Sequence, residues 1–183
     1  MNSSPIISLA RTVPAAIVRS GIQRVFVNRL RRATGYVRHI VIVSPWITAG
    51  KERASPFSVL LKIIHSLRVP TYIITRRPQD AAHLAAIELL KGCPTVELVY
   101  NDNVHAKVYA ACGPPPHGFA ILGSANLTAG SLDNYEIGLL VVGVGAGSVI
   151  AEDLANFGIR HLRTRPESQV IKKMDFRKIR NAL

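Results

Sequence analysis

The sequence predicts an α/β fold, in which helices cover the faces of a β-sheet. Two observations carry this prediction. Short apolar runs rich in β-branched residues, typical of buried strands, alternate along the chain with longer stretches whose apolar residues recur at helical spacing. The chain has 183 residues, of which 48% are hydrophobic, enough for one substantial core. We therefore expect a single domain over residues 1–183.

The first predicted element is a basic amphipathic helix over about residues 15–33. Apolar residues such as Ile22, Phe26 and Leu30 fall on one face of this helix, and arginines occupy much of the remainder. Such a helix either packs on the core with its basic face in solvent, or contacts phosphates or an anionic membrane surface.

The predicted core covers about residues 36–160. Ser55 and Pro56 suit the start of a helix, as N-cap and first-turn residue. The predicted strands are residues 39–43, 71–75, 95–100, 108–110, 119–122 and 136–142, and the predicted helices are residues 55–67, 81–91 and 149–157. The glycine-rich residues 143–147 only superficially resemble a dinucleotide-binding loop, so we expect a flexible connection and no cofactor. Residues 161–183 are polar and rich in Lys and Arg, which predicts a basic C-terminal tail.

The net charge of +12 predicts a polyanionic partner. No apolar run reaches the roughly 20 residues that a membrane span needs, and residues 1–14 lack the features of a secretory signal. Cys93 and Cys112 show neither zinc-ligand spacing nor a disulfide pattern. We therefore expect a cytoplasmic protein whose polyanionic partner is DNA, RNA or an anionic membrane surface, and the charge alone does not choose among them.

Polar residues that suit the binding of a phosphate group cluster between positions 105 and 136. His105 and Lys107 lie two apart, so in an extended segment they project on the same side. The segment from Gly123 to Asn126 follows an apolar run, and its glycine permits close approach of a ligand while Ser124 and Asn126 offer hydrogen-bond donors. Together, an imidazole, an ammonium, a hydroxyl and an amide make a site for a phosphate group.

This pattern resembles the motif of the phospholipase D superfamily, which is His-x-Lys, an aspartate after four more residues, and Gly-Ser-x-Asn. His105, Lys107, Gly123, Ser124 and Asn126 match it, and Glu136 matches an acidic residue further downstream. The motif aspartate would fall at position 112, where this chain has Cys112; in the family that aspartate is chiefly structural. The resemblance implies a mixed sheet with helices on both faces.

The resemblance also implies a mechanism. One histidine attacks phosphorus and forms a phosphohistidine, and a second protonates the leaving oxygen and then activates water. Carried over, His105 is the nucleophile or the acid, Lys107, Ser124 and Asn126 bind the phosphate oxygens, and Glu136 accepts the other ring N–H of His105. The family's strand end at the cleft rim corresponds to Ser44 and Trp46, and the Trp46 ring is expected either to stack on a substrate or to belong to the core.

That mechanism needs two motifs, and this chain has one. A homodimer, in which each copy contributes its His105 across a two-fold axis, would complete the site. The residues show no metal-ligand spacing, so no metal is expected. The leading hypothesis is a metal-independent, endonuclease-like phosphodiesterase acting on DNA or RNA. The alternatives are a non-catalytic nucleic-acid-binding subunit of a defence or restriction assembly, and a phospholipase or phosphatidyl transferase.

Overall fold

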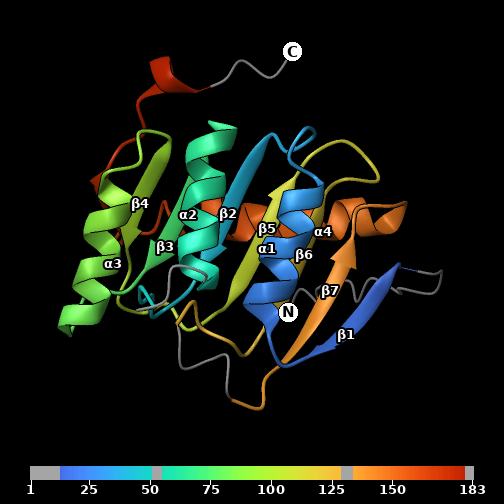
Figure 1. Cartoon of the computed structure of the whole chain (residues 1–183), viewed down its shortest axis with the longest axis horizontal. Helices are drawn as coiled ribbons and strands as arrows, with labels where there is room; N and C mark the ends of the chain where they lie inside the picture. The colour runs from blue at the N-terminus through green and yellow to red at the C-terminus, as the bar shows by residue number, and fades with distance from the viewer. Residues whose placement is uncertain (1–12, 51–54, 129–133, 180–183) are drawn as a thin grey trace, which may run out of the picture.

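The structure is a computed structural model that describes residues 13–50, 55–128 and 134–179. An eight-stranded sheet forms its centre, in the order β1-β7-β6-β5-β2-β3-β4-β8 (Figure 1). The strands are β1 (Ala15–Arg19), β2 (His39–Val43), β3 (Thr71–Thr75), β4 (Val96–Tyr100), β5 (Val108–Cys112), β6 (Phe119–Gly123), β7 (Ile137–Val142) and β8 (Gln169–Lys172). β2, β3 and β4 are parallel and every other neighbouring pair is antiparallel, which confirms the mixed sheet.

Helices lie on both faces of the sheet, as expected (Figure 1). One face carries α1 (Ile22–Arg32), α2 (Pro56–Leu67) and α3 (Ala81–Lys91), and the other carries α4 (Ala146–Asn156) with the π-helix η2 (Phe157–Leu162) that continues it. A 3₁₀ helix, η3 (Phe176–Lys178), follows β8. No helix among the described residues is both long and apolar enough to cross a membrane.

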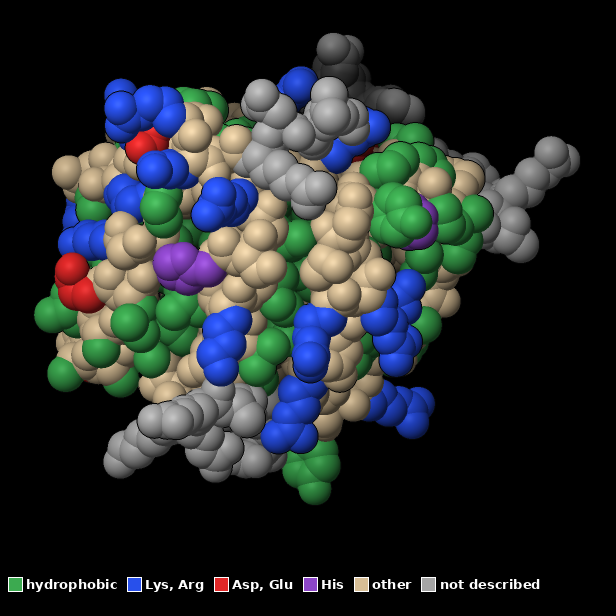
Figure 2. Space-filling model, turned by 45° about the horizontal axis from the view of Figure 1, so that its top comes forward, with side chains coloured by type: hydrophobic (Ala, Val, Ile, Leu, Met, Phe, Trp, Pro, Cys, Tyr) green, Lys and Arg blue, Asp and Glu red, His purple; other side chains and the backbone are tan. Residues whose placement is uncertain are grey.

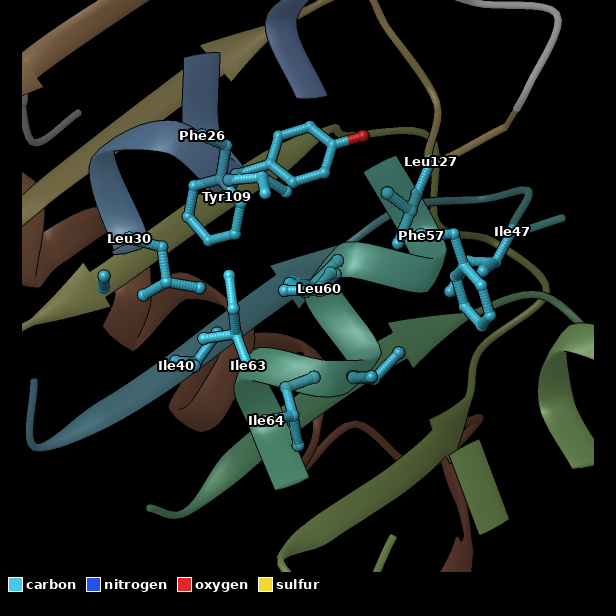
Figure 3. Close-up of a cluster of buried hydrophobic side chains, with 14 of the residues drawn as sticks. Phe26, Leu30, Ile40, Ile47, Phe57, Leu60, Ile63, Ile64, Tyr109 and Leu127 are labelled. Carbon is cyan, nitrogen blue, oxygen red and sulfur yellow. The ribbon is translucent and has the colours of Figure 1, made fainter. Parts of the chain in front are cut away.

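The side chains of β2 show why its sequence is apolar from Ile40 to Val43. Ile40 and Ile42 belong to the core beneath α1, α2 and α3, whereas Val41 and Val43 belong to the core beneath α4 and η2. Because successive side chains of a strand point to opposite faces, a strand covered on both sides must be apolar at every position. Figure 3 shows the larger core, where Phe26 and Leu60 of α1 and α2 meet Tyr109 of β5.

The helix predicted over residues 15–33 is wrong in its first part. Ala15–Arg19 forms the edge strand β1, which pairs antiparallel with β7, and only α1 is helical. Ser20 and Gly21 both have φ of 60°, a left-handed conformation that no right-handed helix accommodates, so they separate the two elements. The apolar helical spacing that suggested the helix belongs to α1 alone.

The C-terminal tail predicted from residue 161 is also corrected. Residues 157–162 form η2, and Gln169–Lys172 adds β8 to the sheet beside β4. The ammonium of Lys172 donates hydrogen bonds of 2.6 Å to the backbone oxygens of Cys93 and Val96. A basic residue assigned to an interaction tail therefore fixes the edge of the sheet, because it satisfies two backbone acceptors.

Candidate active site

The sheet topology brings the predicted site residues to one edge. β2 and β6 end at this edge and β5 and β7 begin there, since Val43 lies opposite Val108 and Leu122 lies opposite Leu139. β3 also ends there, because it runs parallel to β2. We call it the site edge; it is the lower edge of the sheet in Figure 1. The sequence-predicted residues that adjoin these strand ends are Ser44, Trp46, His105, Lys107, Gly123, Ser124, Asn126 and Glu136.

His105 and Lys107 meet just before β5 begins. The Lys107 ammonium lies 3.0 Å from Nδ1 of His105 and donates a 2.9 Å hydrogen bond to the His105 backbone oxygen. An ammonium has donors only, so Nδ1 accepts, and the proton of the neutral imidazole then sits on Nε2. The His105 side chain is exposed, so a ligand can reach it.

Lys107 shares the site edge with a second cation. Burial has the largest effect on Lys107 and lowers its pKa. The guanidinium of Arg76, directly after β3, lowers this pKa further, whereas the Glu136 carboxylate raises it. Two positive side chains held near each other mark a place where an anion would relieve repulsion. Arg76 was not among the predicted site residues: the sequence places it after a predicted strand, but only the pairing of β3 with β2 shows that this strand ends at the site edge.

The turn after β6 is fixed by hydrogen bonds to β7. The Ser124 hydroxyl bonds to a carboxylate oxygen of Glu136 and accepts a 3.1 Å hydrogen bond from the backbone N–H of Ile137. A side chain at Gly123 would place its Cβ 2.9 Å from the Ile137 oxygen, so glycine is required for this approach. Among the described residues, no hydrogen bond joins Glu136 to His105; the partner of Glu136 is Ser124 instead of the imidazole expected from the sequence.

Asn126 is positioned by α1. Its backbone oxygen accepts a 2.6 Å hydrogen bond from Nε2 of Gln23, a residue that is 1% exposed in the first turn of α1. Nothing in the sequence pattern singled out Gln23, because a glutamine in an amphipathic helix is usually exposed. The side-chain oxygens of both residues are buried and have no hydrogen-bond partner within the described chain. These are acceptors held next to the candidate site.

Ser44 has a structural place at this edge. It is fully buried, its hydroxyl donates to the Trp46 oxygen at 2.7 Å, and it accepts from the backbone N–H of Leu127 at 2.9 Å. Both hydrogen-bonding functions of the hydroxyl are therefore engaged. Ser44 ties the end of β2 to the turn that carries Asn126, which differs from the substrate-binding role expected of it.

Trp46 lies against Arg76 rather than open to solvent on both faces. The Arg76 guanidinium lies 4.9 Å from the ring centre of Trp46, and Arg76 Nε donates a 2.8 Å hydrogen bond to the Val104 oxygen. The half-buried indole therefore supports a cation beside the segment that carries His105.

Cys112, at the position of the motif aspartate, lies at the other end of β5. Four residue steps separate it from Val108, which is about 13 Å along a strand. The thiol is buried opposite His39, and burial raises the pKa of Cys112 to about 12, with Glu152 adding to the effect. The departure from the motif therefore bears on the scaffold, not on the groups around His105.

Metal ligands are sparse in this part of the molecule. Over residues 13–50, 55–128 and 134–179, no group of three or more His, Cys, Asp or Glu side chains is arranged to hold a metal ion. The charged groups at the site edge include the cations Lys107 and Arg76 and the carboxylate of Glu136.

No family model matches the sequence, and no curated protein matches it. Solved structures do match the fold. Nuc from Salmonella typhimurium, a phospholipase D family member, superposes with a TM-score of 0.62 at 17% identity, covering 87% of this chain and 98% of that chain. NucT from Helicobacter pylori gives 0.52 at 17% identity, covering 79% and 94%. Polyphosphate kinase from Porphyromonas gingivalis gives 0.60 at 16% identity, covering 88% of this chain and 27% of the kinase. The chain thus has the phospholipase D fold, which confirms the resemblance at the level of the fold.

Proposed function

We propose that this protein is a metal-independent phosphodiesterase, an endonuclease-like enzyme that hydrolyses DNA or RNA. The observation that carries the proposal is the exposed imidazole of His105 beside two cations, Lys107 and Arg76, on the edge that also holds the Gly-Ser-Ala-Asn turn. A phosphodiester needs a nucleophile and positive charge for its oxygens, and this edge supplies both. The fold shared with Nuc supports the assignment.

The first step is attack of an unprotonated ring nitrogen of His105 on phosphorus. A P–N bond forms, the P–O bond to the leaving sugar oxygen breaks, and a second imidazole gives that oxygen its proton. In the second step this imidazole takes a proton from water, the water oxygen attacks phosphorus, and the P–N bond breaks to release a phosphomonoester. Lys107 and Arg76 hold the non-bridging oxygens throughout. An incoming phosphate competes with Nδ1 of His105 for the Lys107 ammonium, so substrate binding frees the imidazole.

The second imidazole comes from a second copy of the chain in this proposal. An apolar row next to the site edge supports self-association: Ile17 lies opposite Leu139 and Leu139 opposite Leu122, across β1, β7 and β6, and all three are exposed. Ile137, on the same face of β7, is 60% exposed. Apolar side chains grouped in this way on a soluble protein usually mark an interface. Each copy would present its His105 across the two-fold axis.

The first test compares the wild-type protein with His105→Ala on labelled single- and double-stranded DNA and RNA, at low salt with EDTA present. We expect cleavage by the wild-type protein and a loss of at least about a thousandfold in the variant, because no other group replaces the nucleophile. Cys112→Ser is the matched control, since Cys112 lies at the far end of β5, and it should retain cleavage.

Binding without His105-dependent cleavage would contradict the enzyme and favour a non-catalytic nucleic-acid-binding subunit. One observation favours that second candidate: the Glu136 carboxylate is bound by Ser124, and no carboxylate of the described residues forms a hydrogen bond with His105 to orient it. Cleavage of phospholipids alone would instead indicate a lipid enzyme.

A further inference from the structure

The N-terminal part of the chain is strongly and one-sidedly basic. Residues 1–79 contain thirteen Lys and Arg but a single acid, Glu52. The two long helices of this part, α1 and α2, contain no acid at all. Their cations therefore have no carboxylate on their own helices to neutralise them, and they form none of the i,i+4 ion pairs that stabilise a helix surface.

Four side chains on these helices define a surface that we call the basic face: Arg24, Arg31 and Arg32 of α1, and Lys62 of α2. All four are exposed. The ion pairs of the described residues join Arg77 to Asp102, Lys91 to Glu88, Arg163 to Glu97 and Arg177 to Asp175, so none of them includes a residue of the basic face. Figure 2 shows blue side chains gathered over this part of the surface with few acidic side chains among them.

The basic face is hollowed rather than flat. A groove of about 390 Å³ runs between the two helices, and Arg31 and Lys62 line it together with the hydroxyl-bearing Thr34 and Ser66. A smaller recess of about 160 Å³ lies on the other side of α1, lined by Arg29, Arg32 and His117 among others. Guanidinium, ammonium and hydroxyl groups around a groove can all donate hydrogen bonds to phosphate oxygens.

Helix electrostatics alone does not account for this arrangement. Arginines in the last turn of α1 do stabilise the negative end of the helix dipole. Lys62, however, lies in the middle of α2, and Arg24 lies near the N-terminus of α1, where a cation is unfavourable. The basic residues are thus distributed over the surface that α1 and α2 share, and not only at the helix C-termini, where the helix dipole would favour them.

An anionic membrane fits the surface poorly. Insertion into a bilayer uses the apolar face of an amphipathic helix. The apolar residues Ile22, Phe26 and Leu30 of α1 are fully buried against the sheet, so they are not available to lipid. Between the cations, the exposed positions of α1 and its end are polar, such as Asn28 and Thr34.

We propose that the basic face binds the phosphate backbone of a nucleic-acid strand, outside the site edge, and anchors the polymer for cleavage. The helix geometry fits: Arg24 and Arg31 are seven residues apart, about 10 Å along α1, which is the length of duplex axis over which one strand carries about three phosphates, at about 3.4 Å of axis each. The basic face also leads to the site edge, because Gln23, adjacent to Arg24, contacts Asn126. The nature of the polymer rests on the proposed function, whereas the location of the surface does not.

The test measures binding of a labelled DNA or RNA oligomer against salt for Arg31→Gln/Lys62→Gln. Each lost phosphate contact lowers the salt slope by about 0.9, so the slope should fall by nearly two and the affinity at about 50 mM salt by at least about tenfold. Hydrolysis of a small aryl phosphodiester should stay at the wild-type rate, because neither residue lies at the site edge. The charge-matched control is Arg165→Gln/Lys173→Gln, two exposed residues elsewhere on the surface, which should bind as the wild type does.

Equal losses in the two double variants would overturn the proposal, because net charge alone would then explain binding. Unchanged binding by Arg31→Gln/Lys62→Gln would overturn it as well, and so would a loss confined to phosphatidylserine vesicles, which would indicate a lipid surface. Failure of the proposed enzyme is distinguishable, because His105→Ala should bind the oligomer normally whether or not the wild-type protein cleaves it.

Discussion

Lys107 connects the electrostatics of the site edge to its pH dependence. Its ammonium contacts His105, and three influences act on it: burial and Arg76 lower its pKa, and Glu136 raises it to a smaller extent. Only the protonated form attracts a phosphate. Because the pKa lies below that of an ordinary lysine, the charge is lost at a lower pH than in a free side chain.

We therefore predict that kcat/KM for a small phosphodiester falls as pH rises, starting below the usual lysine range. In Lys107→Arg this alkaline limb should disappear, because a guanidinium keeps its charge. The measurement is a pair of pH–rate profiles. If both proteins lose activity at the same alkaline pH, another group is responsible and Lys107 does not titrate in the mechanism.

At the residue scale, the sequence identified the site residues whose chemical type and spacing form a motif. It did not identify the residues that reach the site only because the fold brings them there. His105, Lys107 and the Gly-Ser-Ala-Asn turn could be named because their spacing is distinctive. Arg76 and Gln23 could not, because each reaches the site only through the pairing of distant strands and the docking of α1. Ser44 was named for its place at a strand end, but its hydroxyl is used to join β2 to the chain after β6.

Among the elements, the segment after α4 depends on one largely buried charge. Glu97 of β4 has a side chain only 6% exposed and pairs with Arg163, which follows η2. This pair, and the hydrogen bond within it, raises the pKa of Arg163. The ion pair joins the layer formed by α4 and η2 to β4 of the sheet, which is far from it in the sequence.

Arg163→Met should destabilise the fold by about 2–3 kcal/mol, because it leaves Glu97 charged and unpaired in the interior. Urea unfolding of the wild-type protein and the variant measures this loss of stability. Arg177→Met, which breaks an exposed pair with Asp175, is the control and should leave the stability nearly unchanged.

The elements of the core were predictable, and those at its margins were not. The strands from β2 to β7 and the helices α2 and α3 follow directly from apolar patterning, because burial on one or both faces dictates their sequence. β1 and β8 are edge strands with mostly exposed or half-buried side chains, so backbone pairing decides their structure and the side-chain pattern carries little signal. That is why one was read as a helix and the other as a tail.

At the scale of the whole molecule, the proposed shared site requires two chains. A single copy offers one His105, and the exposed apolar row of Ile17, Leu139 and Leu122 lies next to the site edge. Association would therefore cover apolar surface and complete the catalytic pair in one event.

Mixing wild-type protein with His105→Ala tests this. If each site needs a histidine from both chains, activity after subunit exchange should follow the square of the wild-type fraction. A linear dependence would show that each chain acts alone. The control mixture uses Lys173→Gln, an exposed residue far along the chain from the site, and should retain full activity at every ratio.

The strand order has a consequence for how the molecule opens. β5 begins at the site edge and β2 ends there. These two neighbouring strands lie at the centre of the sheet, with three strands on each side of the pair. Amide protons in the outer strands can exchange with solvent when those strands fray, whereas amides in β5 and β2 are released only when the entire sheet comes apart. The strand ends nearest to His105 and Ser44 are thus protected from local opening at the margins of the sheet.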